Sequence, residues 1–186
     1  MIMGTYRMKC ERGFSMVELT MIVGVSVIMM AIAIPSLSTS MRDMQLIADA
    51  RNIATSLTVA RMSATAQMTH CRLSFDLDSN KWRLERLNRS TGQFELQQAD
   101  NALSSEIANS GITFISNSGT APSGFSTSSS TSIRFNSRGI PIDGAGVPSA
   151  DNIIYLSKGD RYFAVSVSLA GKVQLWKLLD GQWVAQ

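Results

Sequence analysis

The sequence predicts an α+β protein in which one long N-terminal helix precedes an antiparallel, β-rich domain. Up to about residue 67, apolar residues recur at spacings of three and four, which is the period of a helix. From His70 onward the period falls to two, and turn residues separate the short apolar segments. Strands that follow one another through short turns pair antiparallel, so helix and strands are segregated along the chain.

The helix begins with an apolar run from Phe14 to Ile34, in which Glu18 is the only charged residue. A helix of this length is roughly 30 Å long, which matches the hydrocarbon core of a bilayer. We therefore expect residues 14–35 to form a membrane helix. A carboxylate in such a helix costs roughly 3 kcal/mol on insertion scales and is usually paired. The plainer alternatives are a simple anchor and an interfacial charge that the membrane tolerates.

The junction before this run differs from that of an ordinary secretory signal. Such a signal is cut after its apolar segment, at small residues, whereas Ile34-Pro35-Ser36 stands there in this chain. A cut would instead fall before the run and remove a basic leader, residues 1–13. The positive leader stays cytoplasmic, and everything after Pro35 is exported. The leader holds three basic residues and one acidic residue, or +2 of the formal net charge of +3, so the basic charge is poor evidence for a nucleic-acid partner.

Gly13, Phe14, Glu18 and Pro35 together resemble the class III signal of type IV pilins and type II secretion pseudopilins. The resemblance implies that a prepilin peptidase cleaves between Gly13 and Phe14 and methylates the new Phe14 amine (N-methylation). It also implies that Glu18 forms an assembly salt bridge with the Phe14 amine of a neighbouring subunit in a helical filament. The physics agrees, because a buried carboxylate is tolerated when an opposite charge meets it.

Beyond the apolar run, Pro35 cannot donate a backbone hydrogen bond, and its ring crowds the carbonyl of Ala31. We expect the helix to kink or loosen there and then to continue, because the helical spacing resumes. Residues 36–67 are therefore predicted to be an amphipathic continuation of the helix that packs its apolar stripe under a sheet. The stripe consists of Leu46, Ala50, Ile53, Leu57, Ala60 and Ala64.

Residues 68–186 are expected to form the exported β-rich domain. Its first hairpin runs from Cys71 to Leu77 and returns with Trp82 and Leu84 facing inward. Further strands are predicted at 94–96, 112–115, 133–135, 153–156, 162–169 and 173–179, and a helical turn or loop at 105–110.

Two other parts of this domain carry weaker signals. Residues 116–132 are rich in Ser, Thr and Gly, and we predict a flexible surface loop with too little apolar content to pack on its own. Trp176 and Trp183 are expected in the core, with an interface anchor as the alternative for Trp183.

Three short patterns, one at the end of the helix from Leu57 to His70 and two in the domain, are similar to GspH/FimT-type minor pseudopilins. This resemblance implies two antiparallel sheets on the helix and a single-pass protein of the bacterial inner membrane with a periplasmic domain. It further implies a subunit near the tip of a type II secretion pseudopilus or a type IV pilus, where it helps to initiate or cap assembly. The implied partners are other major and minor pilins, the prepilin peptidase and inner-membrane lipid. The patterns are Ala60-Arg61, Ile133-Arg134-Phe135-Asn136 with Gly139, and Val165-Ser166-Val167 with Gly171-Lys172-Val173.

The sequence contains no recognisable catalytic or metal-binding set. His70 and Cys71 are adjacent on a strand and point to opposite faces, so they cannot act as a pair. The turn at 76–80 has the spacing that begins a calcium loop, but Lys81 and Leu87 stand where that loop needs Gly and Glu. We therefore expect no enzyme activity, no cofactor and no metal. Removal of the leader would leave Cys71 as a lone cysteine, which we expect to be buried.

Basic residues on the first hairpin suggest a nucleic-acid surface as the alternative function. Arg72, Lys81 and Arg83 can share its outer face, and Arg86 lies close by. A minor pilin with such a surface could bind DNA for uptake, and a pilin could also bind a surface for adhesion. However, alternation turns Trp82 inward, and acidic residues dilute the charge, which favours a solvated strand face. The end of the chain is not basic, unlike that of the family members that bind DNA there.

Overall fold

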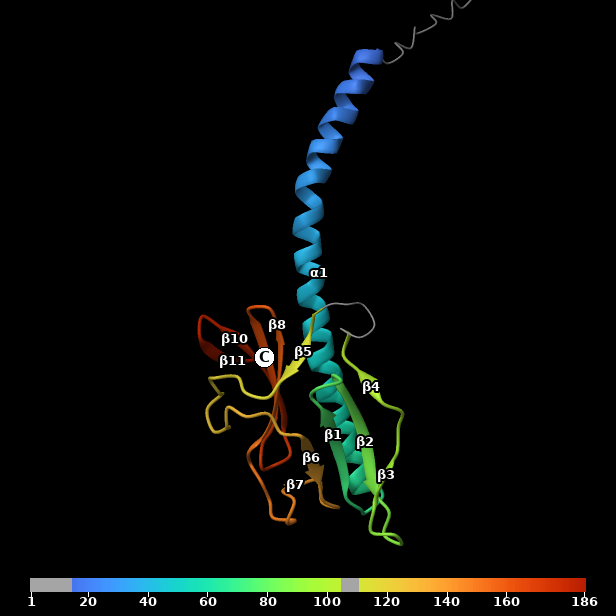
Figure 1. Cartoon of the computed structure of the whole chain (residues 1–186), viewed down its shortest axis with the longest axis vertical. Coiled ribbons are helices and arrows are strands. Elements are labelled where there is room, and N and C mark those ends of the chain that lie inside the picture. The colour runs from blue at the N-terminus through green and yellow to red at the C-terminus, as the bar shows by residue number, and fades with distance from the viewer. Residues whose placement is uncertain (1–14, 105–110) are drawn as a thin grey trace, which may run out of the picture. The chain divides into compact units, whose positions relative to one another are not determined.

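The structure is a computed structural model that describes residues 15–104 and 111–186, of which residues 33–43 are described by their backbone alone (Figure 1). Residues Arg42–Gln186 form one compact unit, and the residues before Arg42 form another. The predicted leader, residues 1–13, and the helical turn or loop predicted at 105–110 lie outside the described residues.

The helix predicted for residues 14–67 is present as α1 (Met16–Ala66). It begins after Ser15, whose Oγ accepts a hydrogen bond from the backbone nitrogen of Val17 over 3.4 Å. Such an N-cap satisfies one of the free backbone donors of the first turn. The helix continues through Pro35, as predicted, because the backbone is helical on both sides of it.

Two antiparallel sheets complete the Arg42–Gln186 unit (Figure 1). The first sheet has the order β3-β2-β1-β6-β7, with β4 also paired to β2, and the second has the order β11-β10-β9-β8-β5. The strands are β1 (Cys71–Asp76), β2 (Lys81–Leu87), β3 (Phe94–Leu96), β4 (Asn101–Ala102), β5 (Thr113–Ile115), β6 (Ser132–Phe135), β7 (Pro141–Ile142), β8 (Asn152–Lys158), β9 (Arg161–Val167), β10 (Val173–Leu179) and β11 (Gln182–Ala185).

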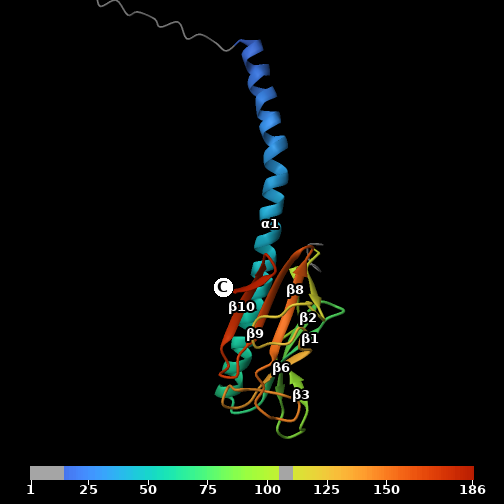
Figure 2. The same cartoon turned by 90° about the vertical axis from the view of Figure 1, so that its left-hand side faces the viewer.

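The C-terminal strands form the predicted meander, and Figure 2 shows β8, β9 and β10 side by side. Before them the chain changes sheet twice: β5 pairs with β8, whereas β6 returns to pair with β1 and sets Phe135 opposite Cys71. The sequence predicted neither of these pairings. It also missed β4, β7 and β11, of which the first two have only two residues each.

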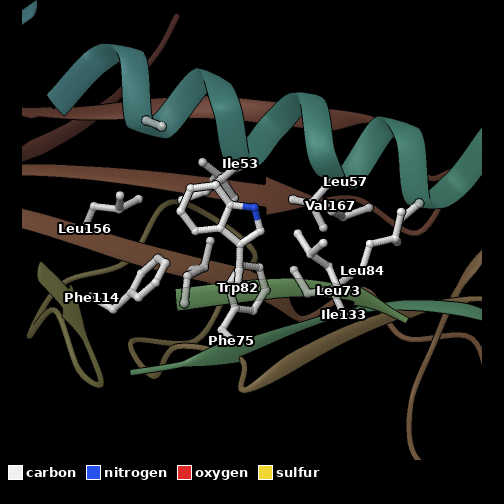
Figure 3. Close-up of a cluster of buried hydrophobic side chains, with 14 of the residues drawn as sticks. Ile53, Leu57, Leu73, Phe75, Trp82, Leu84, Phe114, Ile133, Leu156 and Val167 are labelled. Carbon is white, nitrogen blue, oxygen red and sulfur yellow. The ribbon is translucent and has the colours of Figure 1, made fainter. Parts of the chain in front are cut away.

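One hydrophobic core lies between α1 and both sheets (Figure 3). The predicted stripe of α1 forms its helical side, since every residue of the stripe is at most 1% exposed. Trp82 and Leu84 face inward from the hairpin, as predicted. Trp82 also donates from Nε1 to Ser56 Oγ over 3.2 Å, so the polar atom of this buried ring is satisfied. Cys71 is a buried free thiol, as expected.

The prediction of a flexible loop at 116–132 is corrected by the structure. The hydroxyl of Tyr155 donates to the carbonyl oxygen of Ser126 over 2.7 Å, and the ring of Phe125 lies against Trp176 with 6.5 Å between centroids. The segment therefore packs on the face of the second sheet that points away from the main core. Its own apolar content is low, but the sheet supplies the apolar partners. Trp176 and Trp183 are half-buried in this smaller cluster, and not in the main core where they were expected.

Candidate functional site

Glu18 lies in the first turn of α1, three residues after the N-cap Ser15. This is the spacing of a capping box, and it places the carboxylate near the positive end of the helix dipole. The same helix face carries apolar side chains, which surround a shallow hollow of about 310 Å³. Glu18 is thus a carboxylate on an otherwise apolar and exposed face. The other lining residues are Met21, Ile22, Val25 and Ser26.

Part of the predicted assembly site lies outside the described residues. Gly13 and Phe14, where cleavage and methylation are expected, belong to that part, as does the side chain of Pro35. Within the described part of the chain, no helix is long and apolar enough to cross a membrane. The membrane helix at 14–35 stays a prediction.

The basic residues of the first hairpin are mostly paired. Arg72 forms an ion pair with Glu85. Arg83 forms another with Asp100, with 3.6 Å between Arg83 Nε and Asp100 Oδ1. A carboxylate beside a cation weakens the positive potential that would attract phosphate groups. These pairs favour the solvated strand face over the nucleic-acid surface.

The two other candidates are placed differently by the register of the hairpin. Lys81 lies opposite Asp76 on the outer face, which it shares with Arg72 and Arg83 as predicted. Arg86 alternates to the other face and donates to the side-chain oxygen of Gln67 over 2.9 Å. The three residues that were predicted to share the outer face therefore lie on it, and Arg86 lies on the other face.

Another arginine joins this outer face, and the sequence did not single it out as a binding residue. Arg134 of β6 lies directly opposite Arg72 of β1. The ring of Phe94 on β3 contacts both guanidinium groups, with centroid distances of 4.1 Å to Arg72 Cζ and 4.9 Å to Arg134 Cζ. Alternation between Ile133 and Phe135 signals that Arg134 faces outward. It does not signal that β6 lies beside β1.

The described residues offer little for catalysis. No group of three or more His, Cys, Asp or Glu side chains among them could hold a metal ion. Burial raises the pKa of the Cys71 thiol, which makes it a poor nucleophile. A groove of about 650 Å³ between α1 and β10 is lined by Arg51, Lys172, threonines and glutamines, without a candidate general base.

One family model matches the chain. Residues 49–171 match the family model described as type II transport protein GspH. Two solved structures of the minor pseudopilin EpsH from the type II secretion system of Vibrio cholerae are similar to this chain, both with a TM-score of 0.47. One is 15% identical and covers 70% of this chain and 95% of its own; the other is 14% identical and covers 73% and 94%. No curated protein sequence matches the chain.

Proposed function

The chain belongs to the GspH family of type II transport proteins, and on this premise we propose that it is a minor pseudopilin that enters a filament through its N-terminal helix. Members of this family are structural subunits, so the chain is not an enzyme. The observation that carries the proposal is the exposed Glu18 on an apolar helix face. Met21, Ile22 and Val25 beside it are each more than half exposed. Such a surface needs lipid or other helices to cover it.

In the proposed filament, α1 helices of several subunits bundle through these apolar faces. The Glu18 carboxylate of one subunit forms a salt bridge with the Phe14 amine of its neighbour and accepts a hydrogen bond from it. A carboxylate left unpaired between apolar helices is costly, so the pair selects one register of the helices. Cleavage between Gly13 and Phe14 creates the amine, and methylation leaves it cationic. The intact mass of the purified protein would show both the loss of residues 1–13 and one added methyl group; an uncut chain would contradict this step.

Assembly is tested by Glu18→Ala and by Glu18→Gln, which keeps the size of the side chain and removes its charge. We expect both variants to stay in the membrane fraction with an unchanged folded domain. Their recovery in sheared filaments should fall at least about tenfold. In both variants the buried Phe14 amine of the neighbouring subunit loses the carboxylate that pairs with it. Asp160→Asn, which changes an exposed carboxylate in the turn between β8 and β9, serves as the control. Normal co-assembly of the Glu18 variants would contradict the proposal.

The position at the filament tip, where the subunit would initiate or cap assembly, belongs to the same proposal. Mass spectrometry of the culture supernatant and of the sheared surface fraction, with and without this protein, tests it. Loss of secreted enzymes with pilin retained indicates type II secretion, which is the outcome that the family match favours. Loss of the major pilin with secretion retained indicates a type IV pilus.

The alternative of a DNA-binding minor pilin is tested separately by a gel shift with the full chain. Salt-sensitive binding that is lost in Arg83→Ala and Arg86→Ala would support it. The carboxylates beside Arg72 and Arg83 speak against it.

A further inference from the structure

The outer face of the first sheet carries nearly balanced charge. Two of its acidic side chains form ion pairs with basic ones and a third lies opposite Lys81, so the face offers no continuous positive track for a phosphate backbone. The basic residues are Arg72, Lys81, Arg83 and Arg134, and the acidic ones are Asp76, Glu85 and Asp100.

Arg134 differs from the other cations on this face. Its Nε is buried and has no hydrogen-bond partner, and no described residue forms an ion pair with its guanidinium. It lies directly opposite Arg72, and two like charges in that position repel. Glu85 compensates Arg72, and the ring of Phe94 covers both guanidinium groups. Among the residues that the structure describes, no second carboxylate compensates Arg134 in the same way.

We propose that Arg134 and Phe94 form a docking point for a carboxylate side chain of a partner protein. The carboxylate would form an ion pair with Arg134, as Glu85 does with Arg72. A planar guanidinium held against an aromatic ring is preorganised for a carboxylate, since less side-chain entropy is lost on pairing. Leu96, which is 56% exposed and lies opposite Glu85 on the same outer face, offers an apolar surface to the partner. The partner segment therefore carries an Asp or Glu together with an apolar residue.

This docking point is separate from the assembly contact of Glu18. It lies in the Arg42–Gln186 unit, whereas Glu18 lies in the other. Failure of one proposal leaves the other standing, because each is read from its own variant.

The experiment places the photoreactive amino acid benzoylphenylalanine at Leu96 of the full chain, in the cells that express it. After irradiation, the cross-linked peptide is sequenced by mass spectrometry. We expect a protein segment with an Asp or Glu close to the cross-linked residue. Arg134→Gln should lower the cross-link yield about tenfold, and Arg134→Lys should retain part of it, because the charge remains without the planar fork. Arg138→Gln, an exposed arginine four positions later, should leave the yield unchanged.

A charge swap completes the test. Arg134→Glu should abolish the cross-link, and replacing the partner's carboxylate by arginine should restore it. Thermal unfolding of each variant separates loss of docking from loss of folding. The proposal is overturned by any of four results: no cross-linked protein, a nuclease-sensitive product, a segment without a carboxylate, or an equal yield in a folded Arg134→Gln variant.

Discussion

Arg61 joins three parts of the fold through one side chain. Its guanidinium donates to the backbone carbonyl oxygens of Gly139, Gly171 and Ala170 over 3.1, 2.9 and 3.3 Å. Gly139 follows β6 in the first sheet, and the other two residues connect β9 to β10 in the second. One arginine of α1 therefore ties the helix to both sheets.

Arg61→Met keeps much of the apolar stem and removes the donors, so three carbonyl groups lose their partner. We expect the free energy of unfolding to fall by about 3 kcal/mol, since hydrogen bonds from a charged donor each contribute about 1.5–3 kcal/mol and these are partly exposed. Urea unfolding measures it. Arg51→Met, on an exposed site of the same helix, should change stability by less than about 0.5 kcal/mol. Equal losses in the two variants would show that the carbonyl contacts contribute nothing.

Gly171 is required where this junction is tightest. A Cβ atom there would lie 2.6 Å from the carbonyl oxygen of Gly139, and the backbone φ is +75°. Gly92 has a similar φ of +68° but faces open space. We expect Gly92→Ala to cost about 1 kcal/mol for the left-handed backbone, and Gly171→Ala at least about 3 kcal/mol because overpacking adds to it. A similar midpoint shift in denaturant for both variants would contradict this difference.

Among the elements, the segment at 116–132 depends for its packing on the second sheet beneath it. Tyr155 of β8 is fully buried under it and packs against the ring of Trp183, 5.5 Å away between centroids. Burial, with a smaller effect from the charge of Asp151, raises the pKa of the Tyr155 hydroxyl to about 12. The neutral phenol is therefore part of the packed state of this segment.

The pH dependence of stability follows from that shift. The unfolded chain loses this proton near pH ~10, whereas the folded protein keeps it to about pH 12. The contribution of Tyr155 is thus complete below about pH 10 and is lost as the pH rises toward 12. We expect Tyr155→Phe to cost about 1 kcal/mol at neutral pH, because Ser126 loses its donor, and to flatten the fall of stability above pH ~10. Denaturant unfolding across this pH range measures the effect. If the free energy of unfolding falls with pH as steeply in Tyr155→Phe as in the unchanged protein, Tyr155 is not the group responsible.

For the whole molecule, the core determines which part of the chain folds as a unit. Every residue of the main core cluster lies after Arg42, from Leu46 to Val167. The helix supplies one wall, and the two sheets supply the others. Residues 42–186 therefore contain all of the described hydrophobic packing of this core.

We expect a fragment of residues 42–186 to fold cooperatively without the residues before it. Circular dichroism should show one thermal transition. Leu57→Ala, at a fully buried position, should lower stability by about 3 kcal/mol through the cavity it leaves. Val59→Ala, at a position 40% exposed, should change it by less than about 1 kcal/mol. A broad transition that neither substitution alters would mean that the fragment lacks the native core.

One candidate site can be recognised from the local sequence, whereas the other depends on contacts between distant strands. Glu18 stands out in the sequence because a single charge interrupts an apolar run, which is a local signal. Arg134 does not stand out, because its importance comes from Arg72 and Phe94, which lie on other strands. Lys81, Arg83 and Arg86 look alike in the sequence, yet register and ion pairs separate them.

By itself the sequence determined most of the elements and their faces, but not the strands β4, β7 and β11. The three-and-four spacing placed the buried stripe of α1, and strand alternation turned Trp82 inward, because both periods follow from backbone geometry within a few residues. The tertiary structure alone decided the neighbours: β6 beside β1, β5 beside β8, the packed segment at 116–132 and the contacts of Arg61. Alternation says which side of a strand is buried but not which strand lies next to it. That choice depends on closing the whole core at once, with partners far apart in the chain.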